Sequence, residues 1–414
     1  MADTYKPMFN RTYLKVLLWI VAIAIVFLSA SGRDTNRYLE IEKVDAKPVY
    51  FTEPDNINDL SVQMIFGLGP ALSDETKLLH KLLAKRLQRA LNSNAVSHLL
   101  SPFQARLQLS LQDDRLTLLL SLPPHDLPAD QLRQLQQQLL QQLADTDMNS
   151  NTEAEWARLK AELYLENQSA ENQLLSAFAN TLNDNSSVHP LQRFPSWARN
   201  VLGSHNLALA ISGPDAADTA QVLAEQLPTD DAVSTEQLRS PGLQQRQTLP
   251  ATANEPYALA GLALPGRESN SFMAQLIAVR SLQRTLPDLQ PEVSTRLLWK
   301  SLGLQGYLAL LFYGQHPPAD TAELTPLNQR LLNSTDDDVI DTTRETIKDN
   351  FLERMSEQQA QLGLLNTLAF YRLPPDYISS FADRLASTSD TEVKEQLKMM
   401  LNTNNQQFFY LPAR

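Results

Sequence analysis

The chain has 414 residues, a formal net charge of −12 and no cysteine. This length predicts two or three domains, and the acidic balance argues against a nucleic-acid partner, because phosphate binding needs a basic face. The lack of cysteine excludes disulfides, thiolate metal sites and cysteine nucleophiles. We find no glycine-rich phosphate loop, Walker motif or G-x-S-x-G sequence, so we expect no cofactor.

An uncharged apolar stretch occupies residues 16–32. At about 1.5 Å per residue it nearly spans a hydrocarbon core of ~30 Å, which predicts a transmembrane signal anchor after a cytoplasmic tail at residues 1–15. Lysine and arginine are almost equally frequent on its two sides, but the short tail resembles the start of a secretory signal. We expect a single-pass inner-membrane protein with the bulk of the chain in the periplasm. A cleaved signal peptide is the alternative.

The first elements after this segment are strands and a helix. Residues 48–52 and 60–67 predict the two strands of a hairpin, since both are apolar and a polar turn separates them. Residues 73–91 predict an amphipathic helix, because leucines recur at helical spacing and Ser73 is a suitable N-cap.

A second hairpin is predicted at residues 105–122, with Asp113 and Asp114 at its tip, because its first arm alternates leucine with polar residues. Two amphipathic helices, one of them rich in glutamine, follow within residues 127–167. A short strand and a helix then complete the first half. Residues 229–254 are polar and show little periodicity, which is typical of a linker.

The pattern then begins again. Residues 60–91 and 256–286 share the order apolar strand, Gly-Pro region, polar cap and apolar helix, and both end in Leu-Gln-Arg-x-Leu at an offset of 195 residues. This repeat predicts two tandem duplicated α+β domains, at residues 47–228 and 255–414. In each, a mainly antiparallel sheet would pack against helices.

Several segments carry a resemblance to a known family. The stretch "LSVQMIFGLGP" is similar to the strand before the metal-binding helix of the insulinase/pitrilysin superfamily of zinc peptidases, the inverzincins. "LALAISGPDAADTAQVLAEQLP" is similar to a later strand and helix, and His189-Pro190-Leu191 to a short segment before them. "STRLLWKSLGLQGYLALLFYG" is similar to a second-domain helix and strand that carry an arginine and a tyrosine. The resemblance extends from about residue 47 to the C-terminus.

The zinc motif of that family, H-x-x-E-H, is incomplete in this chain. The matching window reads His80-Lys81-Leu82-Leu83-Ala84. Two histidines at this spacing bind Zn²⁺ and the glutamate between them acts on the bound water, but Leu83 has no proton acceptor and Ala84 has no lone pair for a metal. Three residues near the position of the family's third ligand are Glu153, Glu155 and Glu162. One histidine and one carboxylate do not hold a catalytic zinc, so we predict no metal site and no catalytic residues.

No other site for catalysis stands out. The remaining histidines lack a partner at helical spacing: His98, His125, His189, His205 and His316. A Ser-His-Asp triad assembles in space and is not excluded by spacing, but no local signature supports one.

The resemblance implies a substrate-binding surface in the second domain. Tyr307 matches the family's tyrosine, which contacts the substrate backbone, while Lys300 stands where the arginine is expected. Lysine lacks the bidentate fork of arginine, and Arg296 lies one turn earlier if this segment is helical. The alternative is that Tyr307 only packs at the start of a strand.

Two classes of function follow. The first is a membrane-anchored, catalytically inactive subunit that pairs with a zinc-bearing paralogous peptidase and helps to bind a peptide or an unfolded protein. The second is an envelope adaptor or scaffold that uses the same fold only for protein–protein binding. A third, more remote hypothesis is an active but divergent metallopeptidase.

Overall fold

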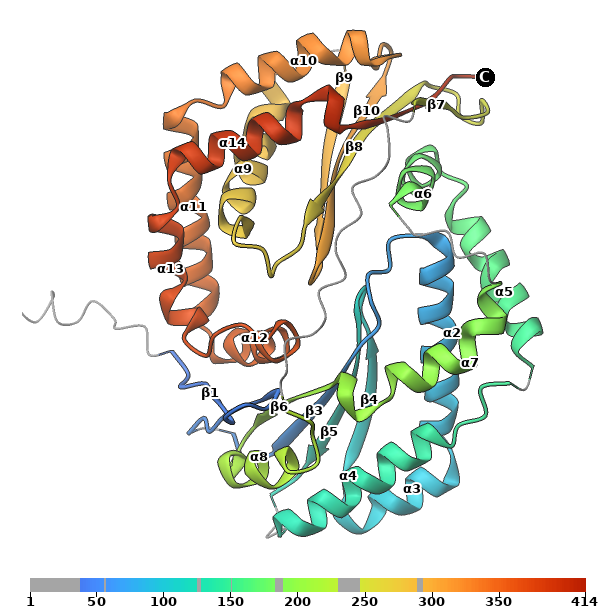
Figure 1. Ribbon diagram of the computed structural model, residues 1–414, viewed down its shortest axis with the longest axis vertical. Coiled ribbons are helices and arrows are strands. Elements are labelled where there is room, and N and C mark those ends of the chain that lie inside the picture. Colours follow the sequence, from blue (N-terminus) through green and yellow to red (C-terminus); the bar gives the residue numbers. More distant parts are fainter. Residues whose placement is uncertain are drawn as a thin grey trace, which may run out of the picture.

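The computed structural model describes residues 38–55, 57–124, 128–149, 151–182, 189–229, 246–288 and 293–414. Within them the chain forms two β-sheets with helices packed on both, in two halves (Figure 1). This confirms the predicted α+β class and agrees with the two-domain arrangement. The predicted tail and transmembrane segment lie outside the described residues, and none of the described helices is long and apolar enough to cross a membrane.

The first half contains one sheet and seven helices that the structure describes. Its strands are β1 (Glu42–Lys43), β2 (Val49–Thr52), β3 (Leu60–Gly67), β4 (Arg106–Leu111), β5 (Arg115–Leu122) and β6 (Leu207–Ser212). Its helices are α2 (Asp74–Leu91), α3 (Asn94–Leu100), α4 (Ala129–Ala144), α5 (Thr152–Glu166), α6 (Ala170–Thr181), α7 (Pro190–Val201) and α8 (Ala216–Ala224).

The second half repeats this design. Its strands are β7 (Arg246–Thr248), β8 (Tyr257–Pro265), β9 (Val293–Ser301), β10 (Gln305–Gly314) and β11 (Gln407–Leu411). Its helices are α9 (Phe272–Thr285), α10 (Thr321–Ser334), α11 (Asp337–Met355), α12 (Gln358–Tyr371), α13 (Tyr377–Ser387) and α14 (Asp390–Leu401). Strand β7 lies within the predicted linker, of which residues 230–245 are outside the described part of the chain.

Five strands of the first sheet have the same order as the second sheet, and β1 is an additional strand at the edge of the first. The first sheet has the order β1-β2-β6-β3-β5-β4 and the second the order β7-β11-β8-β10-β9. In each, one pair is parallel, β2 with β6 and β7 with β11, and the remaining neighbours are antiparallel. The repeated segments therefore occupy equivalent places, with β3 and α2 in the first half matching β8 and α9 in the second.

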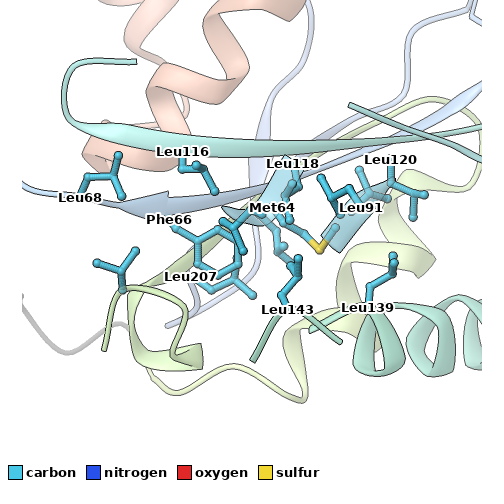
Figure 2. Close-up of a cluster of buried hydrophobic side chains, with 14 of the residues drawn as sticks. Met64, Phe66, Leu68, Leu91, Leu116, Leu118, Leu120, Leu139, Leu143 and Leu207 are labelled. Carbon is cyan, nitrogen blue, oxygen red and sulfur yellow. The ribbon is translucent and has the colours of Figure 1, made fainter. Parts of the chain in front are cut away.

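Local sequence explains the elements around the repeat. Ser73 caps α2 by accepting a hydrogen bond from the backbone N–H of Thr76 at 3.2 Å, and the leucine stripe of α2 is buried against the first sheet. Strand β5 is buried along almost its whole length because both faces of the sheet are covered. Figure 2 shows the core beneath it, where Met64 and Phe66 of β3 meet leucines from β5 and α4.

The two halves exchange a helix. In the first half, α6 leaves its own sheet and packs against β8 and β11 of the second sheet, where Leu174 and Phe178 are fully buried. In the second half, α12 packs against β2, β3 and β6 of the first sheet, where Leu365 and Leu368 are buried (Figure 1). Each sheet therefore has one face covered by its own half and the other face covered by a helix of the opposite half.

Two sequence predictions about local pairing are wrong. Residues 48–52 and 60–67 do form strands, but not a hairpin, because β6 lies between β2 and β3 and pairs with both. The segment predicted to contain a helix before Tyr307 is instead the strand β9, paired with β10 along its whole length. The second hairpin is confirmed, since β4 and β5 are antiparallel and Asp113 lies in the turn between them.

The exchanged helix α6 requires a glycine beneath it. A Cβ atom on Gly261 of β8 would lie 2.7 Å from the ring of Phe178, which is fully buried and has no room to move aside. We expect Gly261→Ala to lower the free energy of unfolding by about 1–3 kcal/mol through overpacking. Urea denaturation measures this effect.

The matched control is Gly363→Ala in α12, where an added Cβ meets nothing within 4 Å. This change should raise the free energy of unfolding by about 0.5–1 kcal/mol, because alanine favours the helix. Equal effects of the two substitutions would contradict the close approach of α6 to β8.

Candidate functional site

A large cleft of about 1420 Å³ lies between the halves. It is lined by the connection from β3 to α2, the start of β6, the connection from β8 to α9, the turn between β9 and β10, and the end of α12. Both halves thus contribute loops to one chamber, whose geometry depends on the helix exchange.

His80 lies on α2 near this cleft and is 3% exposed. Its Nε2 is 3.1 Å from the carbonyl oxygen of Leu68, and its ring stacks on Trp197 of α7 with centroids 5.7 Å apart. Burial lowers the pKa of His80 to about 4, although the carbonyl of Leu68 and the carboxylate of Asp113 act in the opposite direction. The imidazole is therefore neutral at pH 7, and we assign the proton to Nε2, which donates to Leu68.

The four residues that follow His80 in the motif window have structural roles. Leu82 and Leu83 are fully buried in the first core, and Ala84 packs against the same core. Lys81 points outward and forms an ion pair with Glu166 of α5 at 3.0 Å. Helix α2 thus carries a single imidazole in this window.

The carboxylates considered as a third ligand have other partners or none. Glu155 forms ion pairs with Arg86, at 2.8 Å, and with Arg89, and Glu162 pairs with Arg158 at 3.4 Å. Glu153 is exposed. Across the described part of the chain, no three His, Asp or Glu side chains are grouped closely enough to hold a metal ion.

The structure brings Lys300, Tyr307 and Arg296 together on one face of the second sheet. Lys300 of β9 is directly opposite Tyr307 of β10 in the strand register, and Arg296 lies four residues before Lys300 on the same face of the extended strand. This face is turned toward the first half. The three residues that the sequence singled out are therefore neighbours, although on a hairpin and not on a helix.

Both cations on this face are already paired with carboxylates of the first half. Lys300 Nζ is 2.9 Å from Asp113 Oδ2 in the turn after β4, and Arg296 Nη1 is 2.7 Å from Glu171 Oε1 on α6. The ring of Tyr307 meets that of Phe178 edge to face at 5.6 Å. Burial raises the pKa of Tyr307, and the charge of Asp113 raises it further, so the phenol is protonated at neutral pH.

A second group at the cleft was missed by sequence reasoning. The hydroxyl of Tyr371, at the end of α12, donates to Asp114 Oδ2 at 2.5 Å. Its ring lies between the guanidinium groups of Arg115 and Arg267, at 5.3 and 5.5 Å. Burial and the charge of Asp114 raise the pKa of Tyr371. Tyr371 is far in sequence from Asp114 and Arg115. The sequence showed these two residues only as the polar end of a hairpin, so it gave no sign of their contact with Tyr371.

Comparison with known proteins gives a clear result for structure and none for sequence. Neither a protein-family model nor the sequence of a curated protein matches the chain. The inactive domain of an M16 peptidase from Pseudomonas fluorescens superposes with a TM-score of 0.62 at 13% identity, over 91% of this chain and 98% of that one. A chain of complex III2 from Candida albicans, with Inz-5 bound, gives a TM-score of 0.59 at 12% identity over 90% and 96% of the two chains.

The periplasmic protease PqqL of Escherichia coli is similar as well, with a TM-score of 0.58 at 12% identity over 91% of this chain. The match covers 46% of the protease, so this chain spans about half of it. The chain has the M16 peptidase fold. The resemblance to the insulinase/pitrilysin superfamily, to which the sequence pointed, is confirmed at the level of the fold. In this fold, His80 is a neutral, buried side chain of α2 that is held by the carbonyl of Leu68 and the ring of Trp197.

The low pKa of His80 predicts a pH dependence of stability. Between pH 6.5 and 4 the unfolded chain takes up a proton at this residue and the folded chain does not, so the free energy of unfolding falls as the pH falls. At pH 4.5 the loss amounts to about 2.5 kcal/mol relative to pH 7. Urea denaturation at the two pH values should show this loss in the wild type and not in His80→Gln.

The control for this measurement is His98→Gln, since His98 is exposed on α3. This variant should follow the wild type at both pH values. The same pH dependence in His80→Gln and in the wild type would show that His80 titrates normally and is not held neutral by burial.

Proposed function

We propose that this chain is a non-catalytic subunit with an M16 peptidase fold, which holds a peptide or an unfolded protein segment for a zinc-bearing paralogous peptidase. The observation that carries the proposal is the state of α2, where one neutral imidazole remains while Leu83 and Ala84 belong to the core. The cleft beside it is nevertheless retained, with about 1420 Å³ of space. A chamber without hydrolytic chemistry fits a binding role.

The predicted substrate surface supports this reading. Lys300 and Tyr307 lie on the face that looks across to the first half, and both can donate hydrogen bonds to the carbonyl groups of a peptide. Tyr307 retains its proton because burial raises its pKa. Arg296, four residues before Lys300 on the same face of β9, adds a third hydrogen-bond donor to this row. A peptide would have to displace Asp113 or Glu171 from these cations.

Pairing with a second chain is supported by two of the similar structures. The protease PqqL is about twice as long as the region that this chain matches, and a chain similar to this one is part of complex III2. In the proposed complex, this chain supplies a peptidase-like unit that lacks catalytic residues, and a second chain supplies the zinc site. We also propose that residues 16–32 anchor the chain in the inner membrane, with the described residues in the periplasm.

The alternative is an envelope adaptor that binds proteins without any peptidase partner. Both proposed functions are consistent with an α2 that lacks the zinc motif. Only the first assigns a role to the cleft. The two are separated by whether a zinc-bearing paralogue depends on this chain.

The first expected result is the absence of peptidase activity. The full-length chain, purified in detergent and supplied with zinc, should leave unfolded protein and peptide substrates uncut, because α2 lacks the second histidine and the glutamate. Metal analysis should find no stoichiometric zinc. Chelator-sensitive cleavage that His80→Ala abolishes would sink the proposal and restore the divergent-peptidase hypothesis.

The second expected result is a complex. Full-length chain isolated from native membranes should co-elute with a zinc-bearing paralogue, and that paralogue should cleave unfolded protein faster in its presence. A specific complex of this kind buries at least about 1,000 Å², so it should survive size-exclusion chromatography. If the paralogue is fully active alone and never co-elutes, the adaptor function takes the place of the subunit function.

A further inference from the structure

A smaller cavity of about 520 Å³ lies where α2 meets the second half. Its walls come from α2, from the turn between β4 and β5, and from Arg267 and Tyr371 of the second half. His80 contributes one wall, so the cavity occupies the place beside the histidine of the degenerate motif.

The charge of this cavity is opposite to that of the protein. Its lining includes four cations, Lys77, Lys81, Arg115 and Arg267, against two carboxylates, Asp113 and Asp114. His80 adds no charge because its pKa is about 4. The cavity therefore carries a net charge of +2 on a chain whose net charge is −12. A local field of this sign attracts anions.

Part of this cationic capacity is unused. Arg115 is 7% exposed and its Nε has no hydrogen-bond partner, which is costly for a buried donor. The Nε of Arg267 also has none, and within the described residues Arg267 forms no ion pair, only contacts with the rings of Phe272 and Tyr371. Other nitrogens of Arg115 donate to Thr367 at 3.3 Å and lie 3.5 Å from Asp114, but the two Nε atoms are buried donors without partners, which points to a ligand with acceptor oxygens.

The remaining cations are held only loosely. Lys77 pairs with Asp74 at 3.6 Å and Lys81 with Glu166 at 3.0 Å, and the exposed fractions of the four side chains range from 24% to 55%. Ion pairs in such positions contribute little and exchange partners readily. Both ammonium groups can therefore turn toward a ligand in the cavity.

Asp113 links this cavity to the predicted substrate surface. Its carboxylate lines the cavity and at the same time binds the ammonium group of Lys300 at 2.9 Å. The side chain of Asp113 is 55% exposed, and that of Lys300 is 22% exposed. The turn between β4 and β5 thus places a carboxylate of the chain itself on the lysine of the second half.

We propose that this cavity binds carboxylate groups of an acidic peptide segment, and that Asp113 competes with the ligand as an internal stand-in for it. The proposal rests on the peptide-holding role proposed above and names the class of peptide. The ligand's carboxylate enters between Lys81 and Arg267, and a neighbouring carboxylate takes Lys300 from Asp113. The peptide is then selected by charge and released as salt screens the cavity.

The test is direct peptide binding to the full-length chain in detergent, without any partner, followed by fluorescence anisotropy. Three labelled peptides of equal length are compared: one with glutamates and an amidated C-terminus, one with glutamines in their place, and the glutamine peptide with a free C-terminus. The glutamate peptide should bind at least about tenfold more tightly than the amidated glutamine peptide. Its affinity should fall as salt rises from 50 to about 300 mM.

Two variants test the residues. Lys81→Ala should weaken binding of the glutamate peptide by about fivefold, whereas Asp113→Asn should strengthen it by a similar factor, because it removes the competitor and one negative charge. The matched control is Lys348→Ala, an exposed lysine on α11 outside the cavity, which should change nothing. Circular dichroism checks that each variant is folded.

The outcomes separate this inference from the proposed function. Equal binding of the glutamate peptide and the amidated glutamine peptide overturns the carboxylate pocket and leaves the peptide-holding role intact. Weaker binding in Asp113→Asn overturns the role of Asp113 as a competitor. Failure of all three peptides to bind contradicts the peptide-holding role itself. Tighter binding of the free C-terminus than of the amidated glutamine peptide supports the pocket and identifies a terminal carboxylate as a ligand, besides side chains.

Discussion

The reciprocal exchange of α6 and α12 is the constraint on which the rest of this structure depends. Each sheet has two apolar faces, and the helices of its own half cover only one of them. The second face is buried by a helix from the opposite half, with Phe178 on one side and Leu368 on the other. Since apolar area must be removed from water on both faces, neither half is complete without the other, and their relative position is fixed.

This fixed position creates the cleft and its electrostatics. Tyr371 reaches Asp114 because α12 ends over the first sheet, and Arg296 reaches Glu171 because α6 lies against the second. The ion pair of Lys300 with Asp113 joins the same two halves. The polar contacts are therefore consequences of the apolar exchange, and they specify which side chains face one another across the cleft.

The histidine of the degenerate motif illustrates how burial decides chemistry. An imidazole on an exposed helix would titrate near pH 6.5, but in this chain Trp197 and the core beneath α2 remove it from water. The carbonyl of Leu68 and the carboxylate of Asp113 favour the charged form, but the effect of burial is larger and keeps the ring neutral. Three cations, Lys77, Lys81 and Arg267, line the cavity beside this neutral ring, and they give it the positive charge on which the proposed binding of carboxylates rests.

The amino-acid sequence by itself determined the local elements and their repetition. Periodicity and capping located β3, α2 with its N-cap Ser73, and the hairpin of β4 and β5, because these depend on residues close in sequence. The repeat of residues 60–91 in 256–286 predicted two related halves, and the two sheets share a five-strand order to which the first adds β1. The residue types in the zinc motif window also followed from the sequence alone.

Only the tertiary structure decided which distant segments pair. The parallel pairing of β2 with β6 joins residues about 160 positions apart, and no local pattern encodes it. Strand β9 was expected to be a helix because its segment resembles one that the family was taken to have as a helix, and its pairing with β10 resolved the choice. The partners of Lys300, Arg296 and Tyr371 were likewise invisible in the sequence, because ion pairs and hydrogen bonds across the cleft require the two halves to be in place.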